Sequence, residues 1–336
     1  MTNPVLIEVT RGSLVESTHT GAVALADTSG RLLAALGDVK RPVFARSAIK
    51  ALQCLPLIET GAADRFGFGP AEIALACASH SGSERHTTMA GAMLEKIGLA
   101  EVDLKCGAHL PRDTGETRAL LLNGGRPNQL HNNCSGKHAG MLATAVHLGE
   151  PLPGYFEVDH PVQQRIRKTL VEVTGVELGS DALGIDGCSV PTWALPLADM
   201  ARTFARFGTA EGFAPVRRTA IARIVEACWE EPELVAGTGR TDSVVMARLP
   251  GRVFMKTGAE GVYCGAFPEL GLGFALKVDD GAARAAAGAA MALIERLVPA
   301  ARNLIDKRIV RNWRGIVVGS NRSSAEFERA LDRIKL

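Results

Sequence analysis

The sequence has almost no excess of charge of either sign. Lysine and arginine total 38 residues and aspartate and glutamate total 36, which gives a net charge of +2, and the basic residues form no long run. Proteins that bind nucleic acid or an anionic membrane surface usually present a basic field. The composition therefore predicts no nucleic-acid partner and no membrane partner, and it favours a small polar or zwitterionic substrate.

Long apolar runs are also missing. The Ala-rich stretch 281–298 is interrupted by Arg284 and Glu295, so we expect a packed helix there and not a membrane span. The first residues, MTNPVLIEVTRG, lack the basic and apolar segments of a secretory signal. The seven cysteines are an odd number and are scattered along the chain, which favours reduced thiols and a cytoplasmic location.

No G-x-G-x-x-G or G-x-x-x-x-G-K-[ST] stands between a strand and a helix, no repeat is evident, and no low-complexity linker divides the chain. Strand patterns occupy about the first forty residues and return in 252–281 and around 314–320, on either side of a mainly helical middle. This order predicts an α/β (α+β) fold in which one antiparallel sheet, built from both termini, is flanked by helices. We expect a single catalytic unit, 1–336, with an α/β part of about 1–70 plus 235–336 and a helical part of about 71–234.

A serine and a lysine stand three residues apart at the start of a predicted helix, residues 47–61. This spacing places Ser47 and Lys50 on one face, where a neutral lysine could accept the serine proton. The helix is apolar beyond Lys50, which suggests burial. The alternative is an N-cap serine followed by a solvated lysine.

Two further segments could complete such a site. Lys256-Thr257-Gly258 repeats the K-T-G that accompanies S-x-x-K in serine β-lactamases and penicillin-binding proteins. Ser79 directly follows the apolar run EIALACA, where a hydroxyl can enter a cleft; the alternative is a serine-rich turn that caps the next helix.

The stretch HNNCSGKHAG, residues 131–140, holds a thiol, an amine and an imidazole, and a second thiol follows in IDGCSVP, residues 185–191. Two thiols about fifty residues apart, without C-x-x-C pairs, give a weak indication of zinc. A third ligand could come from His138, Asp186 or Lys137, although a lysine must first lose its proton. The alternative is a helix N-terminus capped by asparagine, with two buried cysteines.

These segments resemble the Asparaginase II family, the Rhizobium etli type of L-asparaginase. HNNCSGKHAGM and DGCSVP are the most specific matches; FARSAIKALQ, CASHSGSERH, LPRDTGETRALL and MKTGAEGVYCGAFPELGLGFALKVDDG extend the resemblance over most of the chain, to about residue 281. The resemblance implies a serine-β-lactamase-like fold, a homodimer, and hydrolysis of L-asparagine to L-aspartate and ammonia.

The resemblance also assigns roles to individual residues. It implies two Ser-Lys pairs, Ser47 with Lys50 and Ser79 with Lys256. It implies zinc ligands at Cys134, Lys137 and Cys188, with His138 and Asp186 beside them. Arg46 is a candidate partner for the substrate carboxylate, and a surface or structural arginine is the alternative.

Two other functions remain open from sequence. One is a β-lactamase or D-peptidase with the same fold. The other is a non-catalytic relative that binds zinc or an amino acid, although the presence of Ser47, Lys50, Ser79 and Lys256 together argues against a decayed site.

Overall fold

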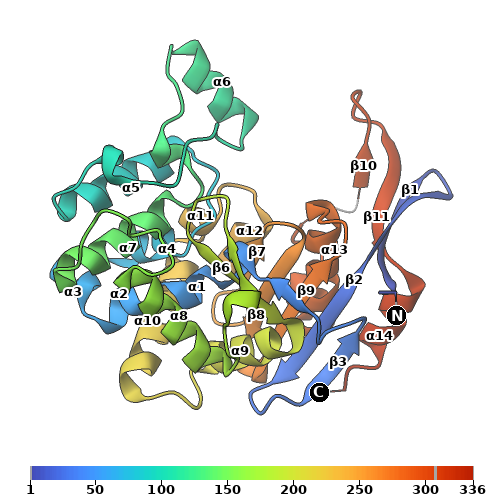
Figure 1. Cartoon of the computed structure of the whole chain (residues 1–336). Coiled ribbons are helices and arrows are strands. Elements are labelled where there is room, and N and C mark those ends of the chain that lie inside the picture. The colour runs from blue at the N-terminus through green and yellow to red at the C-terminus, as the bar shows by residue number, and fades with distance from the viewer. Residues whose placement is uncertain (1, 306–308, 336) are drawn as a thin grey trace. The chain divides into compact units, whose positions relative to one another are not determined.

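The computed structural model describes residues 2–305 and 309–335. The chain forms two compact units, which we call the sheet unit and the helical unit. The sheet unit comprises Met1–Ala48, Leu195–Glu211 and Val244–Leu336, and the helical unit comprises Ile49–Ala194 and Gly212–Ser243. Figure 1 shows the elements of each unit.

The sheet unit is built on an antiparallel sheet whose strands follow the order β10-β11-β1-β2-β9-β8-β7, with β3 paired to β2. Near the N-terminus, β1 pairs with the late strand β11 in the register Ile7↔Ser323. The predicted antiparallel sheet with strands from both termini is therefore confirmed. The strand bounds are β1 Val5–Arg11, β2 Leu14–Asp27, β3 Leu32–Leu36, β7 Phe254–Gly258, β8 Val262–Phe267, β9 Leu272–Val278, β10 Ile309–Arg311 and β11 Val317–Ser323.

Helices α9 (Leu197–Thr209) and α13 (Ala283–Leu297) pack on strands of this sheet. The approach of α9 is close enough to require a glycine, because a Cβ at Gly273 in β9 would lie 2.1 Å from the Ala205 main-chain nitrogen. The Ala-rich α13 buries most of its residues, as expected of a packed helix. The last helix, α14 (Ala325–Asp332), buries Phe327 and Leu331.

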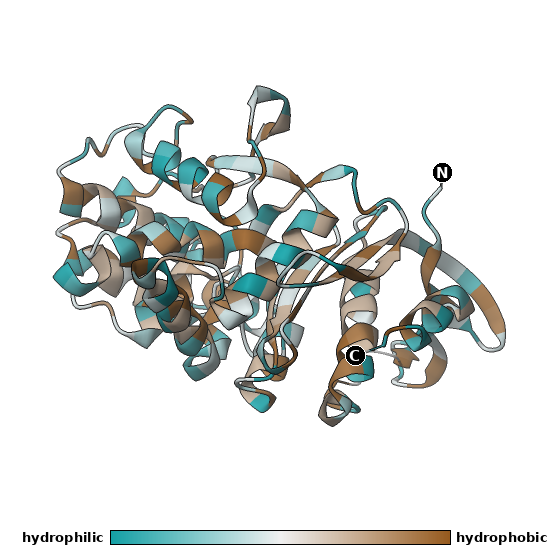
Figure 2. Cartoon of the chain, turned by 90° about the horizontal axis from the view of Figure 1, so that it is seen from below, coloured by the Kyte–Doolittle hydropathy of each residue, from teal (hydrophilic) through white to brown (hydrophobic). Residues whose placement is uncertain are grey.

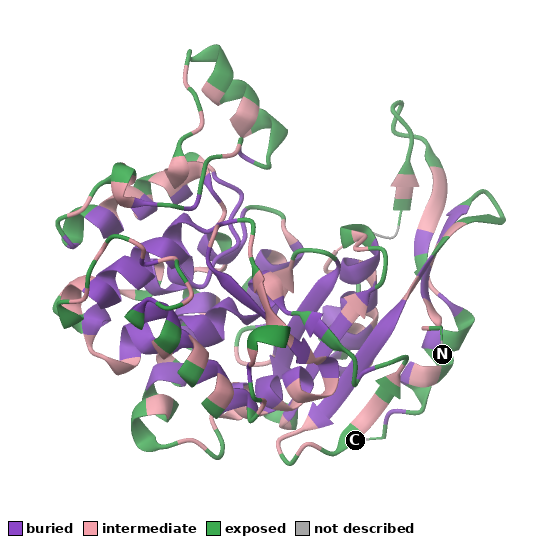
Figure 3. Cartoon of the chain, in the orientation of Figure 1, coloured by how far each residue is buried: buried purple, intermediate pink, exposed green. Residues whose placement is uncertain are grey.

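The helical unit is centred on α4 (Pro70–Ala76) and α7 (Ser135–Leu148), which are almost wholly buried (Figure 3). Gly136 allows this packing, because a Cβ there would lie 2.3 Å from the Leu75 carbonyl oxygen. Most surrounding helices carry both hydrophobic and hydrophilic residues, as amphipathic helices do (Figure 2). They are α2 Leu55–Glu59, α3 Ala62–Arg65, α5 Glu84–Lys96, α6 Thr114–Leu122, α8 Pro161–Thr174, α10 Pro215–Glu230 and α11 Pro232–Val235.

The predicted helix over residues 47–61 is broken in the structure. A 3₁₀ turn, η1 (Arg46–Ile49), leads into α1 (Lys50–Gln53), and α2 starts again at Leu55. Pro56 lies in the first turn of α2, where a residue without an N–H is tolerated, but a continuous helix would need that N–H. Ser47 and Lys50 therefore lie on two successive short helical elements.

Within residues 2–305 and 309–335, no helix has both the length and the apolarity that a membrane crossing requires.

Candidate active site

The helical unit brings two cysteines and two lysines together below its surface. Cys134 is the N-cap residue of α7 and Lys137 lies in the first turn of the helix, while Cys188 follows β5 (Leu183–Ile185). The Lys137 Nζ lies 3.1 Å from Cys188 Sγ, and the Lys50 Nζ lies 3.0 Å from Cys134 Sγ. All four side chains are buried. Each sulfur therefore faces an amine, and this arrangement favours a thiolate.

The two thiols share one proton. A hydrogen bond donated by the Cys134 thiol, aided by the charge of Lys137, lowers the pKa of Cys188 to about 5. The same hydrogen bond, together with burial, raises the pKa of Cys134 to about 12. Burial opposes the charge of Lys137, but attraction to the two sulfurs outweighs it and raises the lysine pKa. The two shifts favour a Cys188 thiolate paired with a Lys137 ammonium.

His138 lies beside this cluster as a neutral imidazole. Burial, followed by repulsion from Lys137, lowers its pKa to about 3. Its Nδ1 lies 2.6 Å from the Tyr155 hydroxyl, and that oxygen also accepts the Lys105 main-chain N–H at 2.9 Å. The buried Nε2 has no hydrogen-bond partner within the described part of the chain. The ring is thus held at one nitrogen, and the other nitrogen is available to a ligand.

The donor atoms of the cluster suit a zinc ion, although no three His, Cys, Asp or Glu side chains among the described residues form a metal-binding group on their own. Two sulfurs, the Lys137 amine and the unpartnered imidazole nitrogen of His138 are the soft and borderline donors that zinc prefers. The half-buried Asp186 lies beside them, with its Oδ2 3.9 Å from Cys188 Sγ. The residues therefore fit the metal, provided that Lys137 binds as a neutral amine.

Ser79 lies in the loop between α4 and α5, and its main-chain N–H donates to the Val235 carbonyl at 2.9 Å. Its buried Oγ accepts a hydrogen bond from Asn133 Nδ2 at 2.8 Å. The Lys50 Nζ donates to the carbonyls of Ala78 at 2.5 Å and Asn133 at 3.3 Å. Lys50 thus ties together the two segments that hold Ser79 and Asn133.

Asn133 and His109 are not among the site residues predicted from sequence. The position of Asn133, directly before Cys134 in HNNCSGKHAG, was the available signal, but a helix cap explained it equally well. His109 stands in a loop without helical or strand periodicity, so no local pattern marked it.

The sheet unit holds Arg46, Ser47 and Lys256. Arg46 has φ 50°, a left-handed conformation that is strained for a residue with a side chain, and it directly precedes the buried Ser47. At the end of β7, a Cβ on Gly258 would lie 2.9 Å from the Ala45 carbonyl oxygen and 3.2 Å from the Ala48 main-chain nitrogen. The absence of a side chain at Gly258 therefore lets the K-T-G strand lie directly against the turn that carries Ser47.

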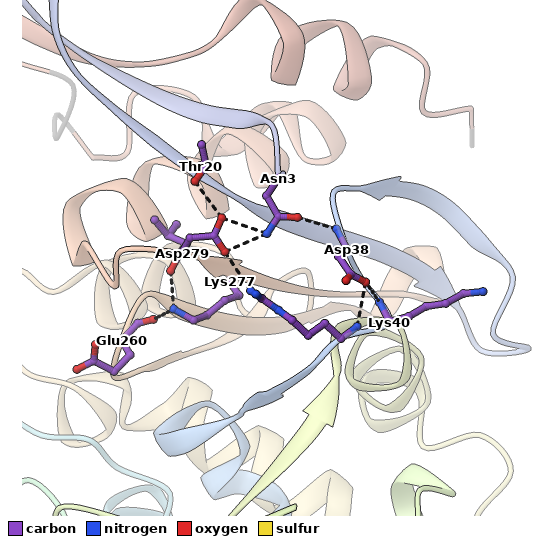
Figure 4. Close-up of polar contacts among 9 residues, drawn as sticks. Asn3, Thr20, Asp38, Lys40, Glu260, Lys277 and Asp279 are labelled. Atoms are coloured by element: carbon purple, nitrogen blue, oxygen red, sulfur yellow. Dashed lines mark hydrogen bonds and ion pairs between the residues drawn. The ribbon is translucent and has the colours of Figure 1, made fainter. Parts of the chain in front are cut away.

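Lys256 itself is completely buried, and its Nζ donates to the Thr257 carbonyl at 3.0 Å. The turn between β7 and β8 is anchored by a lysine of β9. The Lys277 Nζ donates to the Glu260 carbonyl at 2.6 Å and to the Val278 carbonyl at 2.5 Å. Figure 4 shows Lys277 reaching Glu260. Burial lowers the pKa of Lys277. Glu260 has φ 59°, so the bonded lysine stabilises a strained turn close to the end of β7.

A family model described as L-asparaginase II matches residues 7–323. This chain belongs to the L-asparaginase II family. The resemblance drawn from sequence is therefore confirmed, and the match extends beyond residue 281 to include β11.

Solved structures similar to this L-asparaginase II family member include Mglu in its native form, which is 17% identical with a TM-score of 0.37 over 82% of this chain. The match spans only 63% of the Mglu chain. A class C β-lactamase from Rhodobacter sphaeroides is 14% identical, with a TM-score of 0.42, over 83% of this chain and 95% of its own. A β-lactamase from Mycobacterium bovis is also 14% identical, with a TM-score of 0.39, over 82% of this chain and 93% of its own. Such distant similarity says nothing about substrate. No curated protein matches the chain.

Proposed function

We propose that this L-asparaginase II family member hydrolyses L-asparagine to L-aspartate and ammonia, with Ser47 as the nucleophile. The observation that carries the proposal is the close approach of the Gly258 backbone to the turn from Ala45 to Ala48. It joins the serine of S-x-x-K to the strand of K-T-G inside one compact unit, as a serine acyl-transfer site requires.

In the proposed reaction, Lys50 in its neutral form accepts the Ser47 proton, and Ser47 Oγ attacks the side-chain amide carbon. The resulting tetrahedral intermediate collapses to a β-aspartyl ester as ammonia leaves. Ser79, tuned by Lys256, gives a proton to the leaving nitrogen and later helps a water molecule to hydrolyse the ester. Main-chain N–H groups near Ser47 stabilise the oxyanion, each by about 3 kcal/mol.

The remaining predicted residues hold the substrate. Arg46 pairs with the α-carboxylate, and His138 and Asp186 contact the polar groups of the amino acid. Cys134, Lys137 and Cys188 would hold zinc, and when bound the metal supplies a Lewis acid that orients the amino and carboxylate ends of asparagine. We further propose a cytoplasmic homodimer, which chromatography with light scattering and cell fractionation test.

The decisive experiment measures ammonia release by the purified full chain from L-asparagine, from L-glutamine and in buffer alone. Release from asparagine well above both other reactions supports the proposal. A chromogenic lactam, tested in parallel, addresses the β-lactamase alternative. Lactam hydrolysis without ammonia release would replace the proposed function, and no turnover of any of these compounds would favour a non-catalytic binding protein.

A further inference from the structure

Ser79 is held by a chain of hydrogen bonds that lies entirely in the helical unit. Asn133 Nδ2 donates to Ser79 Oγ at 2.8 Å, and the Asn133 main-chain N–H donates to His109 Nε2 at 2.9 Å. The His109 Nδ1 lies 2.8 Å from the Leu110 carbonyl, to which it donates. A carbonyl only accepts and a main-chain N–H only donates, so Nδ1 is the donor and Nε2 the acceptor in these two contacts. Asn133 Oδ1 also lies 3.3 Å from Nε2. The imidazole therefore fixes the backbone that carries Asn133.

The contact from Asn133 determines what the Ser79 hydroxyl can do. A hydroxyl oxygen that accepts a hydrogen bond from an N–H group can still donate its own hydrogen. If the hydroxyl gives that hydrogen away, the same N–H contact stabilises the alkoxide that remains, because a hydrogen bond to an ionised oxygen is stronger than one to a neutral oxygen. The arrangement favours Ser79 as a proton donor.

We propose that Asn133 is a positioning residue that makes Ser79 the acid for the leaving group, and that His109 supports it through the main chain. This inference rests on the proposed amide hydrolysis. When the C–N bond of the amide breaks, the nitrogen takes the hydrogen of Ser79 Oγ and leaves as ammonia. The Ser79 alkoxide is held by the Asn133 N–H until it takes a proton from a water molecule, and the hydroxide so formed attacks the ester.

The test compares two aspartate derivatives that differ only in their leaving group. L-Asparagine must release ammonia, so its nitrogen needs a proton. The β-(4-nitrophenyl) ester of L-aspartate releases a phenolate that needs none. In Asn133→Asp the side chain keeps its size but cannot donate as a carboxylate. Because Ser79 also activates the water for deacylation with either substrate, the acylation step is compared, by single-turnover ammonia release and by the initial burst of nitrophenolate. We expect acylation by asparagine to slow about 100-fold, as for loss of a general acid, while acylation by the ester stays within about threefold of wild type.

Asn128→Asp is the matched control, because it makes the same change at an exposed cap of the same segment. Its Oδ1 accepts the Leu130 N–H, a contact that aspartate retains. We expect wild-type kcat with both substrates. His109→Gln should lower kcat for asparagine about tenfold, and it should have no further effect when it is combined with Asn133→Asp.

Two outcomes would overturn the inference, and a third would overturn the proposed function. Equal losses of acylation rate on the amide and the ester would show that Asn133 is only structural and would overturn the inference. A wild-type acylation rate with asparagine in Asn133→Asp would overturn it as well. If the wild-type protein released no ammonia from asparagine, the proposed function itself would fail, and the failure would be visible before any variant was made.

Discussion

The two units place their candidate residues by different physical means. In the sheet unit, position depends on backbone geometry, namely the left-handed Arg46 before Ser47 and the glycine of K-T-G against the same turn. In the helical unit, position depends on paired side chains, a lysine with each cysteine and an asparagine with Ser79. The arrangement in the sheet unit therefore depends on how closely the backbone segments pack. The arrangement in the helical unit depends on the charge and protonation of its side chains and on bound metal.

The largest effects should come from the two serines, one in each unit. Ser47→Ala should lower kcat more than 1,000-fold for both asparagine and the nitrophenyl ester, because the acyl acceptor is lost. Ser79→Ala should slow acylation by asparagine by a similar factor but should slow acylation by the ester much less. Steady-state kinetics check the effect of Ser47→Ala, and pre-steady-state acylation rates on both substrates check that of Ser79→Ala. Near wild-type turnover by Ser47→Ala would move the nucleophile to Ser79.

Cys188→Ser should affect binding more than chemistry. It removes the sulfur that faces Lys137, so the protein should lose zinc, and KM for asparagine should rise about 10- to 100-fold while kcat changes little. Elemental analysis of wild type and variant, paired with saturation curves, gives the answer. A kcat lowered by orders of magnitude with KM unchanged would instead assign the metal a role in the chemical step. Zinc absent from fully active wild type would remove the metal from the site.

Gly258→Ala tests the shape-dependent half of the comparison. The new Cβ would lie 2.9 Å from a main-chain oxygen, so β7 and the Ser47 turn must separate slightly. We expect kcat/KM to fall about tenfold and the free energy of unfolding to fall by about 1–3 kcal/mol, as in other overpacked sites. Gly91→Ala in α5 is the control, because a Cβ there meets only the end of a leucine side chain at 4.0 Å. Equal losses in the two variants would contradict the assigned role of Gly258.

The smallest expected effect is a pH dependence of stability that comes from the helical unit. His80 and His86 stack at 4.7 Å, and burial lowers the pKa of both below the ordinary 6.5. Below about pH 6.5 the unfolded chain therefore binds more protons than the folded chain, so stability falls as the pH falls and levels off above about pH 7. Urea unfolding between pH 5 and 8 should show this loss.

A substitution distinguishes the contribution of the buried histidines to this pH dependence from that of the other titrating groups. His86→Gln removes one of the two titrating rings and should reduce the slope of unfolding free energy against pH. His147→Gln, at a partly exposed position in α7 of the same unit, is the control for the substitution itself. An unchanged slope in His86→Gln would show that other groups cause the acid sensitivity.

Local sequence determined the elements and the chemistry available to them. Alternating patterns predicted β1 and β2, and the Ala-rich pattern predicted α13, because side-chain periodicity follows directly from backbone geometry. The short spacings within S-x-x-K, K-T-G and HNNCSGKHAG named most of the candidate site for the same reason. The broken helix after Ser47 was missed, although Pro56 was its visible cause.

Contacts between residues distant in sequence were decided only by the tertiary structure. The pairing of Lys137 with Cys188, the close packing of α9 against Gly273 of β9, and the hydrogen bond from Asn133 to Ser79 join segments about fifty to seventy residues apart. Such contacts leave no periodic pattern in either segment, because each partner is also compatible with a solvated cap, a loop or an ordinary buried position. The sequence therefore determined which chemical groups the protein possesses, and the packing of each unit determined which of these groups lie in contact.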